Sequence, residues 1–212
     1  MFITFEGIEG CGKSTQAALL YQALSLKGVS CILTREPGGT RIGRQIRQIL
    51  MSSSNIDLCP VSELFLIVAD RAQHVTEVIR PALAKGGLVI CDRFSDATVA
   101  YQGYGRGLDL DLIGRLNQVS SGGLCPDKTF LLDCPVETGL RRALGRDQEA
   151  ENQTEGRFEA ESIVFHRKVR QGYLELSQAE PERFVVLDAE ESVEDLARKI
   201  LGVVQGLMES KK

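Results

Sequence analysis

The sequence lacks several features that mark particular classes of protein. No apolar run approaches the roughly 18 residues of a membrane-spanning helix, so such a helix is excluded. No excess of basic residues is present either, because 25 Lys and Arg stand against 29 Asp and Glu and leave a net charge of −4. The broad basic surface of a nucleic-acid-binding protein is therefore missing, and any anionic ligand must be held by locally gathered arginines.

Paired metal-binding and redox motifs are also absent. The six cysteines include neither a C-x-x-C pair nor zinc-finger spacing, and His74 and His166 have no companion ligand at a fixed spacing. We interpret both histidines as packing or surface residues. The first five residues, Met-Phe-Ile-Thr-Phe, predict a strand rather than a signal peptide. Free thiols without an export signal indicate a reducing compartment, so we expect a cytoplasmic protein.

What the sequence does contain is a regular alternation of short apolar runs and longer amphipathic stretches. With 212 residues, 43% of them apolar and 25% charged, it predicts one domain over residues 1–212. Predicted strands cover residues 2–5, 30–34, 88–92, 129–133 and 184–187. Predicted helices lie near residues 13–27, 41–51, 61–85, 109–120, 136–146, 158–178 and 192–208, with a flexible turn over the glycine-rich residues 103–107. The alternation predicts an α/β fold with a five-stranded, mostly parallel sheet flanked by helices, whose ligands bind beyond the carboxyl ends of the strands.

The turn after the first predicted strand matches the phosphate-binding pattern G-x-x-x-x-G-K-[ST] at every fixed position. Glycines let the backbone turn so that successive N–H groups point at phosphate oxygens, and the following helix adds the positive end of its dipole. Lys13 is expected to reach the β- and γ-phosphates, and the Ser14 hydroxyl to bind Mg²⁺. The predicted ATP phosphate loop consists of Gly7, Ile8, Glu9, Gly10, Cys11, Gly12, Lys13, Ser14 and Thr15.

A second element of a nucleotide site follows a predicted buried strand. Residues 88–92, Leu-Val-Ile-Cys-Asp, end in a carboxylate in the manner of a Walker B strand, which puts Asp92 near Mg²⁺. The two elements together predict a three-layer fold of the P-loop NTPase type that binds a nucleoside triphosphate with Mg²⁺.

Arginines at several expected element ends require anionic partners. Arg71 lies on the apolar stripe of the third predicted helix, where an unpaired charge is very costly. Asp70 and Glu63 are possible structural partners, but we favour a ligand phosphate because of the neighbouring nucleotide loop. Arg35 and Arg93 each follow a predicted strand. The three arginines are therefore expected to converge at one edge of the sheet.

A polar segment, Asp147–Gly156, carries no large apolar side chain and interrupts two helical patterns. It is either a solvated surface loop or a lid, and the arginines at its edges favour a lid over about residues 142–157. Arg142, Arg146 and Arg157 would then bring positive charge onto the transferring phosphates.

At these positions the sequence resembles the thymidylate kinase family, of the bacterial type with lid arginines. The resemblance covers almost the whole chain, and its combined motifs are far more specific than the phosphate loop alone. The motifs that carry it are Phe5–Thr15, Thr34–Thr40, Ala69–Arg71, Asp92–Phe94 and Ala100–Gly103. The resemblance implies an enzyme that transfers the γ-phosphoryl group of Mg-ATP in line to dTMP, giving dTDP for dTTP synthesis, and that forms a homodimer.

The resemblance also implies roles for individual residues. The three arginines would surround the acceptor phosphate, Glu9 would face the deoxyribose, and Tyr101 would crowd the sugar so that a ribose fits poorly. The implied dTMP-binding residues are Glu9, Arg35, Pro37, Ile67, Arg71, Arg93, Thr98, Tyr101 and Gln102. The implied catalytic residues are Lys13, Arg93, Arg142, Arg146 and Arg157. The implied metal ligands are Ser14 and Asp92.

Two positions depart from the family pattern. The family usually has a phenylalanine four residues before the helix arginine, where it stacks on thymine, and this chain has Ile67 there. The loss of an aromatic face makes dUMP the obvious competitor of dTMP. Cys11 stands where a small residue is common, and its place at a helix start predicts a lowered thiol pKa, inactivation by alkylation and protection by ATP.

Two other functions remain open from the residues alone. Another nucleoside monophosphate kinase, acting on UMP, CMP or AMP, would share most of these elements. A nucleotide-gated switch or DNA-associated ATPase would need only the phosphate loop, but the guanine-reading motif N-K-x-D and a basic surface are missing. A panel of acceptors separates the kinases, and ATP consumption without an acceptor would favour the second class.

Overall fold

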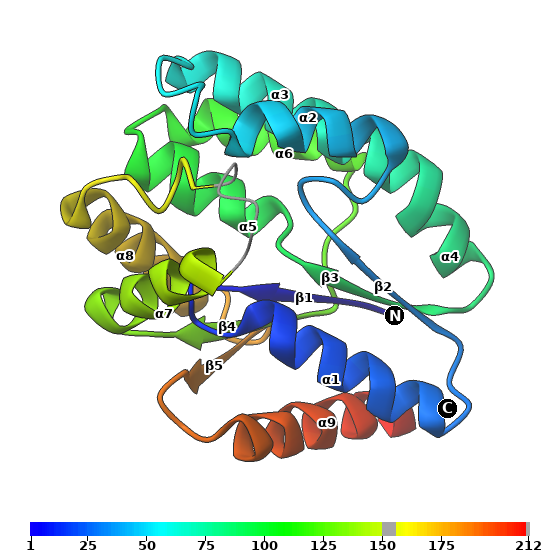
Figure 1. Cartoon of the computed structure of the whole chain (residues 1–212). Coiled ribbons are helices and arrows are strands. Elements are labelled where there is room, and N and C mark those ends of the chain that lie inside the picture. Colours follow the sequence, from blue (N-terminus) through cyan, green and yellow to red (C-terminus); the bar gives the residue numbers. More distant parts are fainter. Residues whose placement is uncertain (150–155, 211–212) are drawn as a thin grey trace.

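The fold centres on a parallel β-sheet, which the computed structural model of the chain in Figure 1 places between layers of helices. The structure describes residues 1–149 and 156–210, with side chains over 1–145 and 156–210. The strands are β1 (Phe2–Glu6), β2 (Cys31–Arg35), β3 (Leu88–Asp92), β4 (Lys128–Asp133) and β5 (Phe184–Asp188). Within the described residues they form one five-stranded sheet in the order β2-β3-β1-β4-β5, with every neighbouring pair parallel. The predicted fold class is confirmed.

Helices follow each strand and cover both faces of the sheet. The longer helices are α1 (Lys13–Leu26), α2 (Arg41–Met51), α3 (Pro60–His74), α6 (Leu110–Ser121), α7 (Val136–Glu149), α8 (Ile163–Ala179) and α9 (Val193–Ser210). The shorter helical segments are η1 (Val75–Ile79), α4 (Arg80–Ala84), α5 (Ser95–Thr98) and η2 (Val99–Gly105), of which η1 and η2 are π-helical. In Figure 1, α1 and α9 lie below the sheet, whereas α2, α3 and α6 lie above it. No helix in the described ranges combines the length and the apolarity that crossing a bilayer requires.

The central strands are buried on both faces, which explains why their sequences are almost continuously apolar. Every residue of β1 is buried, and the ring of Phe5 stacks on that of Phe130 in β4 with centroids 5.3 Å apart. Strands β2 and β5 lie at the two edges of the sheet; all residues of β2 and three of the five in β5 are partly or fully exposed. A parallel sheet covered by helices on both faces requires this pattern.

The register of the sheet brings three strand ends to one edge. Phe5 of β1 pairs with Asp92 of β3, and Asp92 in turn pairs with Arg35 of β2. The loops that follow β1, β2 and β3 therefore begin side by side, beyond the carboxyl ends of the strands. Ligands of open α/β sheets bind in this place.

Two predicted segments differ from the structure. The helix expected over 61–85 is interrupted by η1, because Pro81 in α4 has no backbone N–H and the hydrogen-bond ladder that approaches it widens. The flexible turn expected over 103–107 is wrong for its first part, because η2 continues to Gly105. A Cβ on Gly103 would lie 2.4 Å from Leu110, so this glycine permits close packing.

Helix boundaries near the polar segment also differ from the prediction. α8 begins at Ile163 rather than near 158, because the Ser162 hydroxyl caps it by accepting a hydrogen bond from the backbone N–H of Phe165. α7 continues to Glu149, so the first residues of the segment expected to be a lid are helical. Residues 150–155 of that segment lie outside the described residues.

Candidate active site

The phosphate loop has the backbone that its glycines predict. Between β1 and α1 the chain takes positive φ angles at Gly7, Gly10 and Gly12, of 139°, 70° and 96°. Gly10 is also fixed by space, since a Cβ there would lie 1.9 Å from the carbonyl oxygen of Gly139 in α7. Only glycine adopts these conformations at little cost, so the loop can wrap around a phosphate and still contact the start of α7.

Two side chains at the start of α1 carry the polar groups of the phosphate loop. Lys13 is buried, and its Nζ donates to the carbonyl oxygen of Ile8 at 2.6 Å. The Ser14 hydroxyl donates to a carboxylate oxygen of Asp92. These hard oxygen donors suit Mg²⁺, which prefers one or two protein oxygens together with nucleotide phosphates. No group of three or more His, Cys, Asp or Glu side chains in the described ranges is arranged to hold a metal by itself.

Arg93, directly after β3, lies at the centre of a buried polar network. Its backbone has a φ of 70°, which costs a non-glycine residue about 1–2 kcal/mol. Its guanidinium lies over the Tyr101 ring, 4.7 Å from the centroid, and donates to the Tyr101 hydroxyl at 2.9 Å. It also donates to the Gly7 carbonyl and to the Tyr173 hydroxyl, each at 3.1 Å. The strained backbone thus holds a cation against the base of the phosphate loop.

Glu9 projects from the phosphate loop toward this cation. One of its carboxylate oxygens accepts from the Tyr101 hydroxyl at 2.5 Å and from Arg93 Nη2 at 3.1 Å. Burial raises the pKa of this carboxyl, but the His166 imidazole, whose Nδ1 lies 3.4 Å from the second carboxylate oxygen, and the cations of Arg93 and Lys13 outweigh it and lower the pKa to about 2. Glu9 is therefore ionised at neutral pH.

Glu6, at the end of β1, is a second buried carboxyl in the network around Arg93. It accepts from the backbone N–H of Phe94 at 2.7 Å and from the Tyr173 hydroxyl at 2.8 Å. Complete burial, followed by repulsion from Asp96, raises its pKa to about 8. Neither Glu6 nor Tyr173 was among the residues expected at the site, although a carboxyl at the end of an apolar strand is a signal that a sequence contains.

Arg71 has a structural carboxylate partner that is neither of the two considered from the sequence. Its main carboxylate partner is Glu36, whose oxygen lies 2.8 Å from Nε, rather than Asp70 or Glu63. The guanidinium also donates to Asn117, to the Phe94 carbonyl and to Thr98, at distances of 2.6 to 3.0 Å. These four hydrogen bonds leave one of its five N–H groups for a ligand.

A single cleft brings the expected residues together. All nine residues expected to bind the acceptor line it: Glu9, Arg35, Pro37, Ile67, Arg71, Arg93, Thr98, Tyr101 and Gln102. The same cleft is lined by Gly10, Gly12, Lys13, Ser14, Thr15 and Asp92. One continuous space thus touches both the phosphate loop and the arginines at the neighbouring strand ends.

Comparison with known proteins decides the family. The thymidylate kinase family model matches residues 5–200 of the chain. The chain belongs to the thymidylate kinase family. It is 56% identical over 206 residues to a thymidylate kinase of Geotalea daltonii, covering 97% of this chain and 96% of the relative. It is 57% identical over 189 residues to that of Trichlorobacter lovleyi, covering 89% of each chain. The crystal structure of thymidylate kinase from Ehrlichia chaffeensis superposes with a TM-score of 0.77 at 33% identity, covering 97% of this chain and 98% of that one.

Two of the arginines expected in the lid of this thymidylate kinase family member differ in burial. Arg157 is buried, donates to Glu63, to the Leu50 carbonyl at 3.2 Å and to the Asn55 carbonyl at 3.1 Å, and does not line the cleft. A catalytic arginine is expected to face the transferring phosphates. Here the Arg157 guanidinium is held instead by the Glu63 carboxylate, 94 residues away in sequence. Arg142 on α7 is exposed and donates to the Ala189 carbonyl at 3.0 Å.

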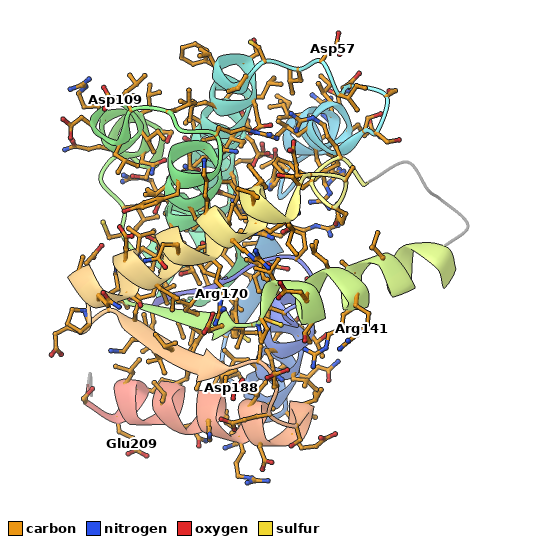
Figure 2. The ribbon with its side chains drawn as sticks, turned by 90° about the vertical axis from the view of Figure 1, so that its left-hand side faces the viewer. Asp57, Asp109, Arg141, Arg170, Asp188 and Glu209 are labelled. Atoms are coloured by element: carbon orange, nitrogen blue, oxygen red, sulfur yellow. The ribbon has the colours of Figure 1, made fainter. Side chains whose placement is uncertain are left out.

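The rest of α7 near the expected lid is only partly described. The side chain of Arg146 lies outside the described residues. Figure 2 shows the neighbouring Arg141 on the outer side of α7, directed away from the sheet.

Glu63, expected from the sequence only as a possible partner of Arg71, organises a separate buried network. Its carboxylate is fully buried and accepts from Gln102 Nε2 at 2.8 Å, from Arg106 through Nε and Nη2 at 3.1 Å each, and from Arg157. Arg106 also bonds Glu161 at 2.5 Å. One carboxylate thus ties the base of the cleft to the chain that follows the expected lid.

The cysteines are expected to differ sharply in reactivity. Cys59 is exposed, and its hydrogen bond to Ser62 lowers the pKa of its thiol. Cys11 is only 2% exposed. We therefore expect iodoacetamide to modify Cys59 about ten times faster than Cys11, because a thiolate reacts only where the reagent reaches it. Activity should fall with Cys11 alkylation only, and ATP should slow only that step.

Peptide mass spectrometry beside an activity assay measures both rates. Cys11 modification that outpaces Cys59, or complete Cys11 modification with full activity retained, would contradict this expectation.

Proposed function

We propose that this protein transfers the γ-phosphoryl group of ATP in line to dTMP, giving dTDP and ADP. The observation that carries the proposal is the cleft shared by the phosphate loop and by Arg35, Arg71 and Arg93. A second anion fits beside the ATP phosphates only where cations are gathered, and a sugar or other alcohol acceptor would not need three arginines. The thymidylate kinase family, to which the chain belongs, supports dTMP as that anion.

Lys13 and the N-terminus of α1 hold the donor phosphates in this proposal. Ser14 and Asp92 would hold Mg²⁺, which supplies charge neutralisation on the β- and γ-phosphates when it is bound. Lys13 Nζ, now on the Ile8 carbonyl, would turn to a phosphate oxygen. The acceptor phosphate has a second pKa near 6, so it is largely deprotonated at neutral pH and attacks without a dedicated base. Positioning and charge neutralisation then supply most of the acceleration.

Side chains on η2 and α3 would bind the nucleoside part of the acceptor. Tyr101, held by Glu9, closes the space beside the sugar and disfavours a ribose. Thr98 and Gln102 would contact the thymine or its sugar. Ile67 would cover the base with an aliphatic side chain, which gives up about 1 kcal/mol of stacking that an aromatic ring provides.

The helical arginines of α7 would supply positive charge to the transferring group. Arg142 and Arg146 are separated by one helical turn, so they lie on the same face of α7. Arg157 would contribute by anchoring the end of the expected lid through Glu63 rather than by touching phosphate.

The proposal also includes a cytoplasmic location and the use of dTDP for dTTP synthesis. It further includes a homodimer, for which the surface of the protein gives an argument. Large apolar side chains are exposed on two helices that pack together, α3 and α6. Phe65 on α3 is 55% exposed and Val119 on α6 is 79% exposed. Apolar side chains of this size on neighbouring helices favour a second copy as partner.

ADP release should depend strictly on an acceptor. With saturating Mg-ATP and no nucleotide acceptor, we expect a rate below about 1% of that with dTMP, because water lacks the contacts that position an acceptor phosphate. A coupled ADP assay with and without dTMP makes the comparison. Equal rates in both mixtures would instead support a nucleotide-gated switch or ATPase.

A further inference from the structure

His166, on α8, is a buried histidine that the proposed mechanism does not use. Its side chain is fully buried, and neither ring nitrogen forms a hydrogen bond within the described part of the chain. Its Nδ1 lies 3.4 Å from Oε2 of Glu9, and this carboxylate oxygen is likewise buried without a hydrogen bond. Buried polar atoms nearly always have partners, because an unpaired one loses its hydration without compensation. Two such atoms that face each other indicate a contact left incomplete in this state.

The other oxygen of Glu9 is fully engaged. Oε1 accepts from the Tyr101 hydroxyl and from Arg93, at 2.5 and 3.1 Å. The carboxylate is therefore fixed at one oxygen and can turn about it. A shift of a few tenths of an ångström would bring Oε2 within the usual 2.7–3.2 Å of an N–H donor.

Among the described residues, the polar contact that joins His166 to the cleft is the one with this carboxylate. Glu9 lines the cleft, whereas His166 does not. An aliphatic side chain would fill the same buried space without leaving two nitrogens unpaired, so packing alone does not account for an imidazole here. A direct role toward substrate is equally unsupported, which leaves the contact with Glu9 as the feature to explain.

We propose that His166 is a positioning residue for the acceptor nucleotide that acts through Glu9. When the phosphate loop closes on its ligands, the Nδ1–H donates to Oε2, and the carboxylate is held at both oxygens. Its plane is then fixed toward the acceptor sugar. The inference rests on the proposed function in one respect, namely that Glu9 faces that sugar.

Two substitutions at this position separate the donor from the bulk of the ring. His166→Leu removes the nitrogen, and His166→Asn keeps an N–H donor near the place of Nδ1. We expect His166→Leu to lower kcat/KM for dTMP about 10-fold or more, the effect of losing a hydrogen bond to a charged group, with KM for ATP unchanged. His166→Asn should recover most of this loss. The melting temperature of His166→Leu should stay the same or rise, because an unpaired buried polar group is removed.

A double-mutant cycle with Glu9→Gln identifies the route of the effect. If His166 acts through the Glu9 carboxylate, His166→Leu causes no further loss of kcat/KM for dTMP in the Glu9→Gln background. Ser177→Ala is the matched control, since Ser177 is a buried polar residue on the same helix whose hydroxyl, within the described ranges, donates to the Leu174 carbonyl alone. It should leave kcat/KM for both substrates unchanged.

The outcomes distinguish this proposal from the proposed function. Additive losses in the cycle, equal losses toward ATP and dTMP, or wild-type kinetics in His166→Leu would overturn the positioning role. A wild-type enzyme that phosphorylates a different nucleotide and not dTMP would overturn the proposed function instead. The same cycle, run with the nucleotide that is phosphorylated, would then decide the role of His166.

Discussion

Replacing Arg93 with Met is expected to lower kcat/KM for dTMP by about 10³-fold, the upper range for loss of one preorganised charged donor. The side chain lines the cleft, where it would meet the acceptor phosphate, and it is the cation shared by the Tyr101 and Tyr173 hydroxyls and Glu9. Its removal takes away both the positive charge and the group that aligns the phosphate loop with η2. Steady-state kinetics with dTMP varied at saturating Mg-ATP measure the effect.

Two further variants serve as controls for this prediction. Arg93→Lys retains the charge but not the fork of donors, so it should recover only part of the activity. Arg141→Met removes an arginine from the exposed face of α7 and should change kcat/KM less than about 2-fold, as surface substitutions usually do. A loss of less than about 10-fold in Arg93→Met would show that the cation is not part of the site.

Replacing Glu63 with Gln is expected to destabilise the protein by about 3–5 kcal/mol, the usual cost of breaking a buried ion pair from one side. Arg106 and Arg157 both pair with the Glu63 carboxylate, so its loss would leave two neighbouring guanidinium cations without the negative charge that they share. For a chain of this length the change corresponds to a fall in melting temperature of about 6–20 °C.

Thermal unfolding with and without dTMP measures this loss. Glu161→Gln is the matched control, because Glu161 is the more exposed partner of Arg106, with 29% side-chain exposure, and its loss should cost less than about 1 kcal/mol. Equal melting temperatures for Glu63→Gln and the wild type would mean that this network is not what holds Arg157 in place.

Features that are set by residues close together in the sequence could be predicted from it. The strands and most helix spans follow from apolar periodicity, which acts over a few residues. The phosphate loop has fixed spacing because its glycines, Lys13 and Ser14 must act on one ligand from one turn. Asp92 and Arg93 could be placed beside it because the carboxyl ends of parallel strands share an edge.

Partners far apart in sequence could not be predicted. Glu36 holds Arg71 across 35 residues, and Glu63 holds Arg157 across 94. Nothing in a single sequence pairs one carboxylate with one arginine over such distances, because the pairing depends on how helices pack on the sheet. His166 shows the same limit, since an imidazole within a helical pattern looks identical whether it faces solvent, the core or a carboxylate.

The most direct test of the central claim is a comparison of kcat/KM for a panel of acceptors at saturating Mg-ATP. We predict that the value for dTMP exceeds those for UMP, CMP and AMP by about 10³-fold or more, since a site built to bond one base and exclude a ribose leaves polar groups unpaired with the others. dUMP, which lacks one methyl group and meets Ile67 rather than an aromatic ring, should come within about 100-fold of dTMP. A value for UMP, CMP or AMP equal to or above that for dTMP would contradict the account.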